Sequence, residues 1–489
     1  MNNGIKEFLD LKESDDVEVV EVITDDVNLI KTVVMEKRYE PKFCPVCNYR
    51  MYSKGIYVRT LMHPILNDGY KPVIKLRQRK YQCTNAECNT YINDEFLFAQ
   101  RNKRTTNVTP YLVLDDLKDI TVSVAHVSRI RNISETWIHQ IVMSYLKFER
   151  LPLGEALCID EVFLDIGKDA RYCVVLRDFL TGNIIDILPN RYKETFEKYF
   201  YHIDRKERLK VRFVISDMYE PYLKLPEKFF NNAISVIDSF HVIAWINNKI
   251  NLLINDVKKE YQKKDDEKRK ERNHKENKNF IKRKDSKEVY LLKNHRWVLL
   301  MNDDNIDRSL PPKRINQLGG YYSTRQIEEQ FLSLNPDFKI VKELKERYIR
   351  FNNEYIGKPD EAAYGLDELI DVYKNSNYKM FNDFALILNS HKKEILASFT
   401  SLDIIPGNEE RIADEYRRMS QGPMEGFNRK PKDMKRLARG YTNFDFVRNR
   451  ILLSERDDIH ILGTPIPVKQ IKAKYKTDKK RGKYKKHNK

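Results

Sequence analysis

The sequence predicts a multidomain α/β protein, in which a cysteine-bearing module and a helix pair precede a mixed α/β domain with an all-helical insertion. Two patterns support this fold class. Four of the 6 cysteines lie in one window near the N-terminus. From residue 156 onward, helical periodicity gives way to apolar runs that are typical of strands. With 489 residues, of which 41% are hydrophobic, the chain is long enough for several cores.

Composition excludes several classes of protein. Charged residues make up 33% of the chain, but 11% is aromatic, which indicates folded domains rather than a disordered polyelectrolyte. No segment approaches the ~18 consecutive apolar residues of a membrane span. The acidic N-terminus does not have the pattern of a signal peptide. We therefore expect a soluble intracellular protein without a membrane partner.

The net charge of +17 indicates a nucleic-acid partner. The charge is unevenly distributed, because residues 1–40 hold 11 acidic and 5 basic residues, whereas residues 468–489 hold 11 basic residues and a single acid. A short lysine tail adds affinity without specificity, so the functional prediction has to rest on other residues.

The clustered cysteines form two pairs with the spacing of metal ligands, C-x2-C and C-x4-C: Cys44, Cys47, Cys83 and Cys88. Two such turns complete a tetrahedral Zn²⁺ site in a zinc ribbon. The segment Val73–Cys83 alternates apolar and basic residues and is expected to be a strand of an inserted hairpin that leads into the second turn. The alternatives are unrelated buried thiols or disulfides, and the lack of a secretory signal disfavours disulfides.

Residues 115–146 predict two short helices joined by a tight turn. An apolar set at helical spacing begins at Val124, Asn132 suits the turn, and Ser134 can cap a second amphipathic run. Judged alone, this pattern fits an ordinary helical hairpin as well as a helix-turn-helix. The neighbouring zinc ribbon and basic strand favour the helix-turn-helix, and with it DNA binding.

The central part of the chain predicts a mixed sheet. Three β-rich runs come first, with a turn at Thr181-Gly182, and a helix near Lys193–Ile203 and two further apolar strands follow. Three sequential strands followed by alternating helix and strand describe a sheet like that of the RNase H fold. The five expected strands cover residues 156–166, 171–180, 183–190, 211–217 and 233–238.

Two aspartates occupy apolar strand contexts. Asp160 lies in the first strand, and Asp217 ends the fourth. If these strands are neighbours, both carboxylates meet at one edge of the sheet, where they repel each other unless a cation lies between them. Two divalent ions would relieve the repulsion and bind the attacking and leaving oxygens of a phosphodiester. Glu161 adjoins Asp160 but is expected to point to the opposite face. For any single acid among 72, a solvated surface group is the ordinary interpretation.

A third carboxylate is expected from Glu425. Gly422-Pro423 can start a helix that carries Glu425 in its first turn and Asn428 one turn later. A basic stretch follows, within which Pro431 predicts a kink or a restart of the helix. This stretch and the basic strand supply the candidate DNA contacts: Arg77, Arg79, Lys80, Arg429, Lys430, Lys435, Arg436 and Arg439.

The long interval between Asp217 and Glu425 predicts the all-helical insertion. Residues 256–288 are highly charged and are interpreted as a solvated helix or a flexible arm. Helical periodicity predicts four further helices, at residues 323–331, 340–351, 361–373 and 381–399.

These motifs together resemble the ISL-three family of insertion-sequence transposases, which are bacterial DDE enzymes with an N-terminal zinc ribbon and helix-turn-helix. The resemblance extends from about Phe43 to Leu453. Its most specific parts are Ile159-Asp-Glu161, Ser216-Asp217-Met-Tyr-Glu-Pro-Tyr222, Val236-Ile-Asp-Ser-Phe-His-Val242, Met424-Glu-Gly-Phe-Asn428, and Lys435-Arg436 with the following residues to Phe444.

The resemblance implies that Asp160, Asp217 and Glu425 form the catalytic triad and hold Mg²⁺ or Mn²⁺. It also implies that Asp238 and His241 support the site, and Asn428 is grouped with them; simple packing at a helix start is the alternative for His241. The implied partner is double-stranded DNA, at both transposon ends and target, bound by a homodimer or higher oligomer in the cytoplasm near the nucleoid.

The expected function is therefore a DNA transposase that binds terminal inverted repeats and catalyses metal-dependent strand cleavage and strand transfer. The alternatives are a non-catalytic regulator derived from a transposase and a nuclease without strand transfer. The expected divisions are an acidic segment (1–40), the zinc ribbon (41–100), the helix-turn-helix (101–150), the RNase H-like domain (151–262 and 411–460), the helical insertion (263–410) and a basic tail (461–489).

Overall fold

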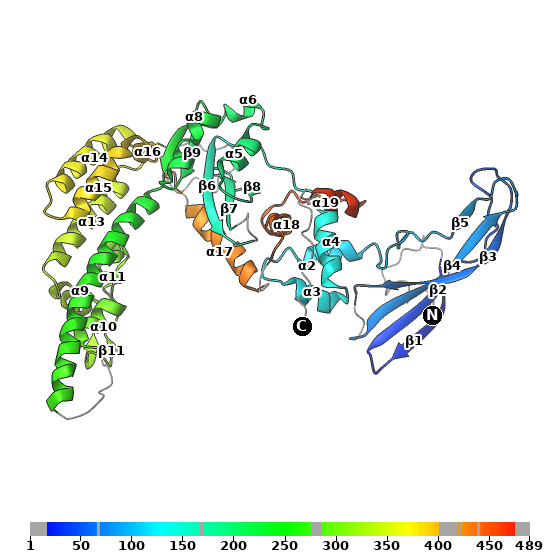
Figure 1. The fold of residues 1–489 in the computed structure, drawn as a ribbon, viewed down its shortest axis with the longest axis horizontal. Helices are drawn as coiled ribbons and strands as arrows, with labels where there is room; N and C mark the ends of the chain where they lie inside the picture. Colours follow the sequence, from blue (N-terminus) through cyan, green and yellow to red (C-terminus); the bar gives the residue numbers. More distant parts are fainter. Residues whose placement is uncertain are drawn as a thin grey trace, which may run out of the picture.

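The computed structural model describes residues 17–65, 69–166, 171–275, 285–400, 418–420, 422–437 and 441–474. Figure 1 shows an elongated molecule, with an N-terminal sheet at one end, a mixed sheet in the middle and a mainly helical region at the other end. None of the helices in these ranges combines the length and the hydropathy needed to cross a membrane.

The N-terminal sheet has the strand order β1-β2-β4-β3, and β5 pairs with β4. β3 and β4 form the predicted inserted hairpin. β2 runs parallel to β4, so the acidic segment contributes two strands, and the boundary expected at residue 40 divides one sheet. The strands are β1 (Glu18–Asp25), β2 (Ile30–Glu36), β3 (Met51–Met62), β4 (Lys71–Cys83) and β5 (Tyr91–Asn93).

Three short helices follow: α2 (Thr109–Asp116), α3 (Val124–Arg131) and α4 (Glu135–Tyr145). α3 ends at Asn132, whose backbone is left-handed with φ 50°. The Ser134 hydroxyl accepts a hydrogen bond from the Trp137 amide at 3.3 Å and so caps α4. Both local predictions are confirmed, because the turn depends on residues that lie next to one another in the chain.

The central sheet has the strand order β10-β9-β6-β7-β8. β6, β7 and β8 form an antiparallel meander with Gly182, at φ 73°, in the second turn, whereas β9 and β10 run parallel to β6. The predicted neighbours β6 and β9 are therefore confirmed. The strands are β6 (Ala156–Phe163), β7 (Tyr172–Asp178), β8 (Ile184–Leu188), β9 (Phe213–Ser216) and β10 (Ile234–Ile237).

Helices cover both faces of this sheet. Alternate residues of β6 divide between two cores: Leu157 and Ile159 pack with the helices that connect the strands, whereas Cys158 and Val162 pack with helices from the C-terminal part of the chain. The connecting helices are α5 (Lys193–Phe200), α6 (Arg205–Arg208), α7 (Glu220–Leu223) and α8 (Leu225–Phe229). The C-terminal helices are α17 (Gly422–Leu437), α18 (Phe444–Glu455) and α19 (Val468–Lys474).

The three N-terminal helices share a core with the sheet. Side chains of α2, α3 and α4 belong to the same buried cluster as those of α17, α18 and the sheet. Arg450 of α18 is fully buried and donates hydrogen bonds to the backbone carbonyls of Leu117 and, at 2.9 Å, Val122, both just after α2. The buried guanidinium thus fixes the three-helix unit to the central domain.

Most of the described residues between Ser239 and Phe399 are helical. α9 (Ser239–Lys275) is one helix of 37 residues that continues outward from the sheet, so the boundary expected at residue 262 falls inside it. The predicted helices are confirmed, although the last is divided at His391. The others are α10 (Lys287–Asn294), α11 (Trp297–Leu300), η1 (Asp303–Asn305), α12 (Thr324–Ser333), α13 (Asp337–Glu354), α14 (Pro359–Lys374), α15 (Lys379–Ser390) and α16 (Lys392–Ala397).

The prediction that this region is all-helical is wrong in one place. β11 (Lys313–Ile315) and β12 (Gly320–Tyr322) form a two-stranded antiparallel sheet. Pro311 and Pro312 precede it and lack the amide donors that a helix needs. Gly319, with φ 84°, adopts the left-handed backbone that completes the hairpin.

α17 carries two residues of the expected site, Glu425 and Asn428. The chain remains helical through Pro431, so the helix does not restart there. Beyond α18, the basic tail begins with α19, and residues 475–489 lie outside the described ranges.

Candidate active site

Three aspartates lie at one edge of the parallel part of the sheet. Asp217 directly follows β9 and Asp238 directly follows β10, whereas Asp160 lies within β6, at the level of Asp217 in the register of the two strands. Because these strands are parallel neighbours, their carboxyl ends meet at one edge of the sheet. Two residues before each aspartate, the side chain belongs to the core that includes α17: Cys158, Ile215 and Val236. The alternation of side chains therefore places all three aspartates towards α17.

Asp160 is held from two directions. Its Oδ1 accepts the backbone amide of Glu161 at 2.7 Å, and its Oδ2 accepts the side-chain amide of Asn428 at 2.6 Å. Asn428 is 8% exposed, so its contact with the carboxylate is shielded from solvent. The structure therefore joins the first strand of the sheet to α17 through the residue that the sequence grouped with the site.

Asp160 and Asp217 are electrostatically coupled. Burial raises the pKa of both carboxyl groups above the ordinary value, and the nearby His241 opposes this shift in each. The charge of Asp217 raises the pKa of Asp160 further. Such carboxylates gain from a hard divalent cation, for which carboxylate oxygens are preferred ligands.

Asp238 and His241 form the start of α9. The Oδ1 atom of Asp238 accepts the Phe240 amide at 3.1 Å, and its backbone carbonyl accepts the His241 amide at 3.1 Å. Asp238 is almost fully buried and lies near Arg418. Burial lowers the pKa of Arg418 to about 10, while Tyr348 and Asp238 oppose that change. Asp238 therefore joins the sheet to the helical region as well as adjoining the site.

Glu425 lies in the first turn of α17, as predicted, one helical turn before Asn428. Its side chain lies outside the description. The contact between Asn428 and Asp160 places the helix that carries Glu425 against β6.

An open cavity of about 470 Å³ adjoins these groups. Arg429 and Lys432 lie three residues apart on α17, so both face the cavity. They add positive charge to a lining that also includes carboxylates. Carboxylates that hold cations and basic side chains that contact phosphate oxygens are the combination that suits a phosphodiester. The lining also includes Asp160, Asp238, Ser239, Phe240, His241, Ile243, Ser420 and Asn428.

Glu161 faces the opposite side of β6, as strand alternation predicts. It accepts the Tyr222 hydroxyl at 2.6 Å and pairs with Arg191 at 3.1 Å. Tyr222 belongs to the core on the other face of the sheet. Glu161 therefore fixes the positions of Tyr222 and Arg191 on the face of the sheet opposite Asp160.

The four clustered cysteines meet at one point. Their sulfur atoms lie within 4.8 Å of one another, with separations of 3.6 Å for Cys44–Cys88 and 3.4 Å for Cys47–Cys83. A tetrahedral site with Zn–S bonds of about 2.3 Å has S–S edges of roughly 3.8 Å. All 6 cysteines are free thiols, so the cluster is not a pair of disulfides. The arrangement indicates a structural zinc site.

The basic residues predicted to contact DNA have varied surroundings. Those on β4 have partners in the N-terminal sheet or next to it: Arg77 pairs with Glu36 at 3.3 Å, Arg79 lies over Tyr39 and Lys80 lies over Tyr91. On α17, Lys430 pairs with Glu455 at 2.9 Å, Arg436 pairs with Asp433, Lys435 lies over Phe163 and Arg429 lines the cavity. Arg439 lies outside the described residues.

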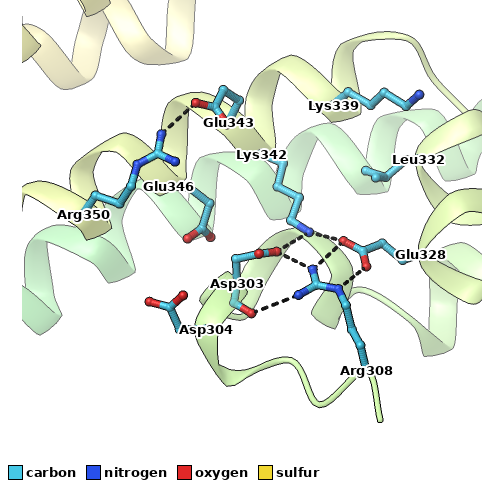
Figure 2. A pocket seen from close by; sticks show the side chains of 10 residues that line it. All are labelled: Asp303, Asp304, Arg308, Glu328, Leu332, Lys339, Lys342, Glu343, Glu346 and Arg350. Atoms are coloured by element: carbon cyan, nitrogen blue, oxygen red, sulfur yellow. Dashed lines mark hydrogen bonds and ion pairs between the residues drawn. The ribbon is translucent and has the colours of Figure 1, made fainter. Parts of the chain in front are cut away.

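A second cavity, of about 360 Å³, lies in the helical region, where charges of both signs face one another (Figure 2). Arg308 pairs with Asp303 at 2.6 Å and with Glu328 at 2.9 Å, and Lys342 contacts both acids. The Arg308 guanidinium lowers the pKa of Asp303 to about 2. Because these acids already have cationic partners, we assign the network to holding η1 against α12 and α13.

Five cavity-lining residues were not predicted as site residues from the sequence: Ser239, Phe240, Ile243, Ser420 and Lys432. For Lys432, a signal was present, because it follows Arg429 by three residues and therefore shares its side of a helix. Ser420 and Phe240 have no comparable pattern, since their place depends on how α17 and α9 pack on the sheet.

Carboxylates gathered at one edge of a mixed sheet, with basic helix residues beside them, suit an enzyme that acts on phosphodiesters with the help of divalent metal ions. Comparison with known families makes this class specific. A family model described as Transposase, that of the ISL3-type DDE transposase domain, matches residues 157–451. The chain therefore belongs to this family, whose members catalyse DNA cleavage and strand transfer, and the resemblance inferred from the sequence is confirmed. The search of curated proteins finds no match.

Proposed function

We propose that the protein binds the terminal inverted repeats of an insertion sequence, cleaves DNA at the ends of the element and joins the released 3′-hydroxyl to target DNA. The observation that supports this most directly is the contact between Asp160 and Asn428, since it brings the helix that carries Glu425 to the carboxylates of the sheet. The strand order, with three antiparallel strands and two parallel additions, supports an RNase H-like domain.

Asp160, Asp217 and Glu425 would hold the Mg²⁺ or Mn²⁺ ions. When bound, the ions activate the attacking oxygen and stabilise the leaving oxygen of the phosphodiester. The residues of the chain would orient the metal ligands: Asn428 fixes the Asp160 carboxylate, the Tyr219 amide donates to Asp217 at 3.0 Å, and both acids are half-buried. His241 adds a polar group beside both.

Recognition of the ends is assigned mainly to the zinc ribbon and the helix-turn-helix in the N-terminal part of the protein. Ser134, Glu135 and Thr136 are exposed at the start of α4, where a helix-turn-helix contacts the bases of the major groove. The zinc-ribbon hairpin and the basic residues of α17 would contact the phosphates, which position DNA without specifying its sequence. Joining two ends requires at least a dimer on the DNA, and the basic tail would add non-specific affinity in the bacterial cytoplasm.

A product assay tests this function. The full chain is incubated with Mg²⁺, a duplex that carries the inverted repeat flanking the gene, and a target plasmid. Joined strands are the expected product. Nicks alone would instead indicate a nuclease, and unaltered DNA would indicate a non-catalytic regulator.

The matched variants are Asp217→Asn and Asp371→Asn. Asp217→Asn is expected to abolish cleavage, whereas Asp371→Asn changes an exposed aspartate of α14, far from the carboxylates, and is expected to have no effect. Full cleavage by Asp217→Asn would show that the proposed triad is wrong.

A further inference from the structure

Two cations and three aromatic rings form a continuous row of contacts that reaches the candidate active site. The Lys435 ammonium lies 5.5 Å from the centre of the Phe163 ring, which is 5.1 Å from that of Tyr172. The Arg191 guanidinium lies 5.2 Å from the Tyr172 ring and 4.9 Å from the Tyr219 ring. We call these five residues the cation–aromatic row. It connects α17, the ends of β6 and β7, and the segment before α7.

One end of the row contacts the site, and the other end lies on α17, about two helical turns beyond Asn428. The Tyr219 amide donates to Oδ1 of Asp217 at 3.0 Å. At the other end, Lys435 belongs to α17, the helix whose Asn428 contacts Asp160. A DNA strand with a phosphodiester at these carboxylates would therefore have its neighbouring nucleotides close to the row.

The rings are held in place from behind. Arg191 pairs with both carboxylate oxygens of Glu161, each at 3.1 Å, and Glu161 also accepts the buried Tyr222 hydroxyl at 2.6 Å. Tyr222 in turn packs edge-on against Tyr219, with ring centres 5.2 Å apart. This arrangement positions the aromatic rings before any partner binds, which reduces the entropy lost on binding.

The rings are also exposed. Phe163 is 47% exposed, Tyr172 44% and Tyr219 36%. Single exposed aromatic residues are common on protein surfaces, but here Phe163 contacts Tyr172, and Arg191 links Tyr172 to Tyr219. Three exposed rings joined in this way form an apolar patch. A patch of this kind suits a planar, apolar and electron-rich partner next to an anion.

Nucleobases attached to a phosphate backbone meet that description. Their faces stack on aromatic rings and guanidinium groups, and Lys435 provides a charge for the phosphate. In an intact duplex each base face is covered by the next base pair, so only an unpaired base can stack on protein side chains. Cutting a strand at the carboxylates would release terminal nucleotides from such stacking.

We propose that the cation–aromatic row is a stacking platform for unpaired bases next to the cleaved phosphodiester. This inference rests on the proposed function for the origin of the unpaired bases. The platform itself can be tested without catalysis, because stacking requires neither Mg²⁺ nor cleavage.

The test measures binding by the full-length, zinc-loaded chain in the absence of Mg²⁺. The probe is a duplex with a short single-stranded flap that carries 2-aminopurine, whose fluorescence is quenched by stacking. The native protein is expected to quench the probe, and the double variant Tyr172→Leu/Tyr219→Leu is expected to bind the flap about tenfold more weakly, in line with the loss of one stacked base. A blunt duplex is expected to bind both proteins equally.

Two controls separate stacking from folding. Tyr172→Phe/Tyr219→Phe keeps the rings and is expected to retain quenching, and Tyr364→Leu removes a tyrosine of α14 that is 78% exposed and is expected to bind as the native chain does. If the double leucine variant does not fold, Phe163→Leu at the exposed end of the row provides the same comparison.

The outcomes distinguish this inference from the proposed function. Equal flap binding by the native chain and the leucine variants would overturn the platform, whether or not the protein cleaves DNA. If the protein quenches the probe only when the rings are present but does not cleave DNA with Mg²⁺, the stacking platform is supported and the proposed catalysis is refuted.

Discussion

The side-chain amide of Asn428 lies 2.6 Å from Oδ2 of Asp160, although 268 positions separate the two residues in the chain. The side-chain NH2 group of Asn428 donates to the carboxylate, and this hydrogen bond fixes the orientation of the Asp160 carboxylate. A metal ligand held in this way by a neighbouring amide has a defined orientation before the ion binds.

Asn428→Ala should reduce DNA cleavage by about 10- to 100-fold, the usual effect of removing a group that orients a metal ligand. The loss should appear as a requirement for more Mg²⁺, measured by titrating the ion in the cleavage assay. Asn449→Ala is the matched control, since Asn449 is equally buried but donates to the Val142 carbonyl, away from the carboxylates. An unchanged Mg²⁺ requirement in Asn428→Ala would contradict the positioning role.

The metal-free protein should lose stability as the pH rises above about 4, through Asp160 and Asp217. Burial raises the pKa of both carboxyls in the folded state, so the folded chain binds more protons than the unfolded chain in that range, and the free energy of unfolding falls with pH. Asp217→Asn should remove part of this slope and raise the melting temperature at pH 7 without metal. A slope that is identical in the variant would refute the assignment.

Mg²⁺ should have the opposite effect. At about one hundred times its Kd, the ion should stabilise the native chain by about 2.7 kcal/mol, whereas Asp217→Asn should gain much less. Thermal melting with and without the ion measures both values, and Ca²⁺ provides a non-catalytic comparison. If Mg²⁺ stabilised the native chain and Asp217→Asn equally, the ion would be bound at a site that does not include Asp217.

One zinc ion per chain should be bound by the four clustered cysteines. Cys47→Ser should release that ion and make the N-terminal sheet sensitive to proteolysis, because structural zinc contributes to folding directly. Elemental analysis and limited proteolysis measure the two effects. Cys173→Ser is the control, since Cys173 is a buried cysteine of β7 outside the cluster, and its retention of zinc is the expected result.

Arg450→Met should destabilise the protein by at least about 2 kcal/mol, because the backbone carbonyls of Leu117 and Val122 would remain buried without a donor. Denaturant unfolding measures the loss. Arg347→Met, on the exposed surface of α13, removes an ion pair with Glu343 and should change the stability by less than about 1 kcal/mol. Similar losses in the two variants would show that the buried contacts contribute little.

Features set by neighbouring residues were predictable from the sequence. The cysteine pairs, the Ser134 cap, the turn at Asn132, the strand that contains Asp160 and the strand that ends before Asp217 all depend on short segments whose chemistry is local. Once the strands were recognised, the mixed sheet limited which of them are neighbours. The local pattern made Glu425 the candidate for the third carboxylate, and the family resemblance then assigned it to the catalytic triad.

Features that depend on distant segments were not predictable. The parallel pairing of β2 with β4 brings an acidic segment into a basic sheet, and nothing in either strand specifies that partner. Arg191 also carries no local signal, because its role comes from Glu161, Tyr172 and Tyr219 on other elements. The short β11–β12 hairpin was overlooked because the helical periodicity around it dominates the pattern.

Arg450 and the core that it adjoins affect the distance between the DNA sequence that the protein recognises and the bond that it cleaves. If α3 and α4 read the end of the element, the reading helices and the cutting carboxylates move as one rigid body, without a hinge between them. The folded protein itself then sets the number of base pairs between the recognised sequence and the cleaved bond. Inserting or deleting a base pair between the two should shift the cut relative to the element's end while keeping its distance from the recognised sequence.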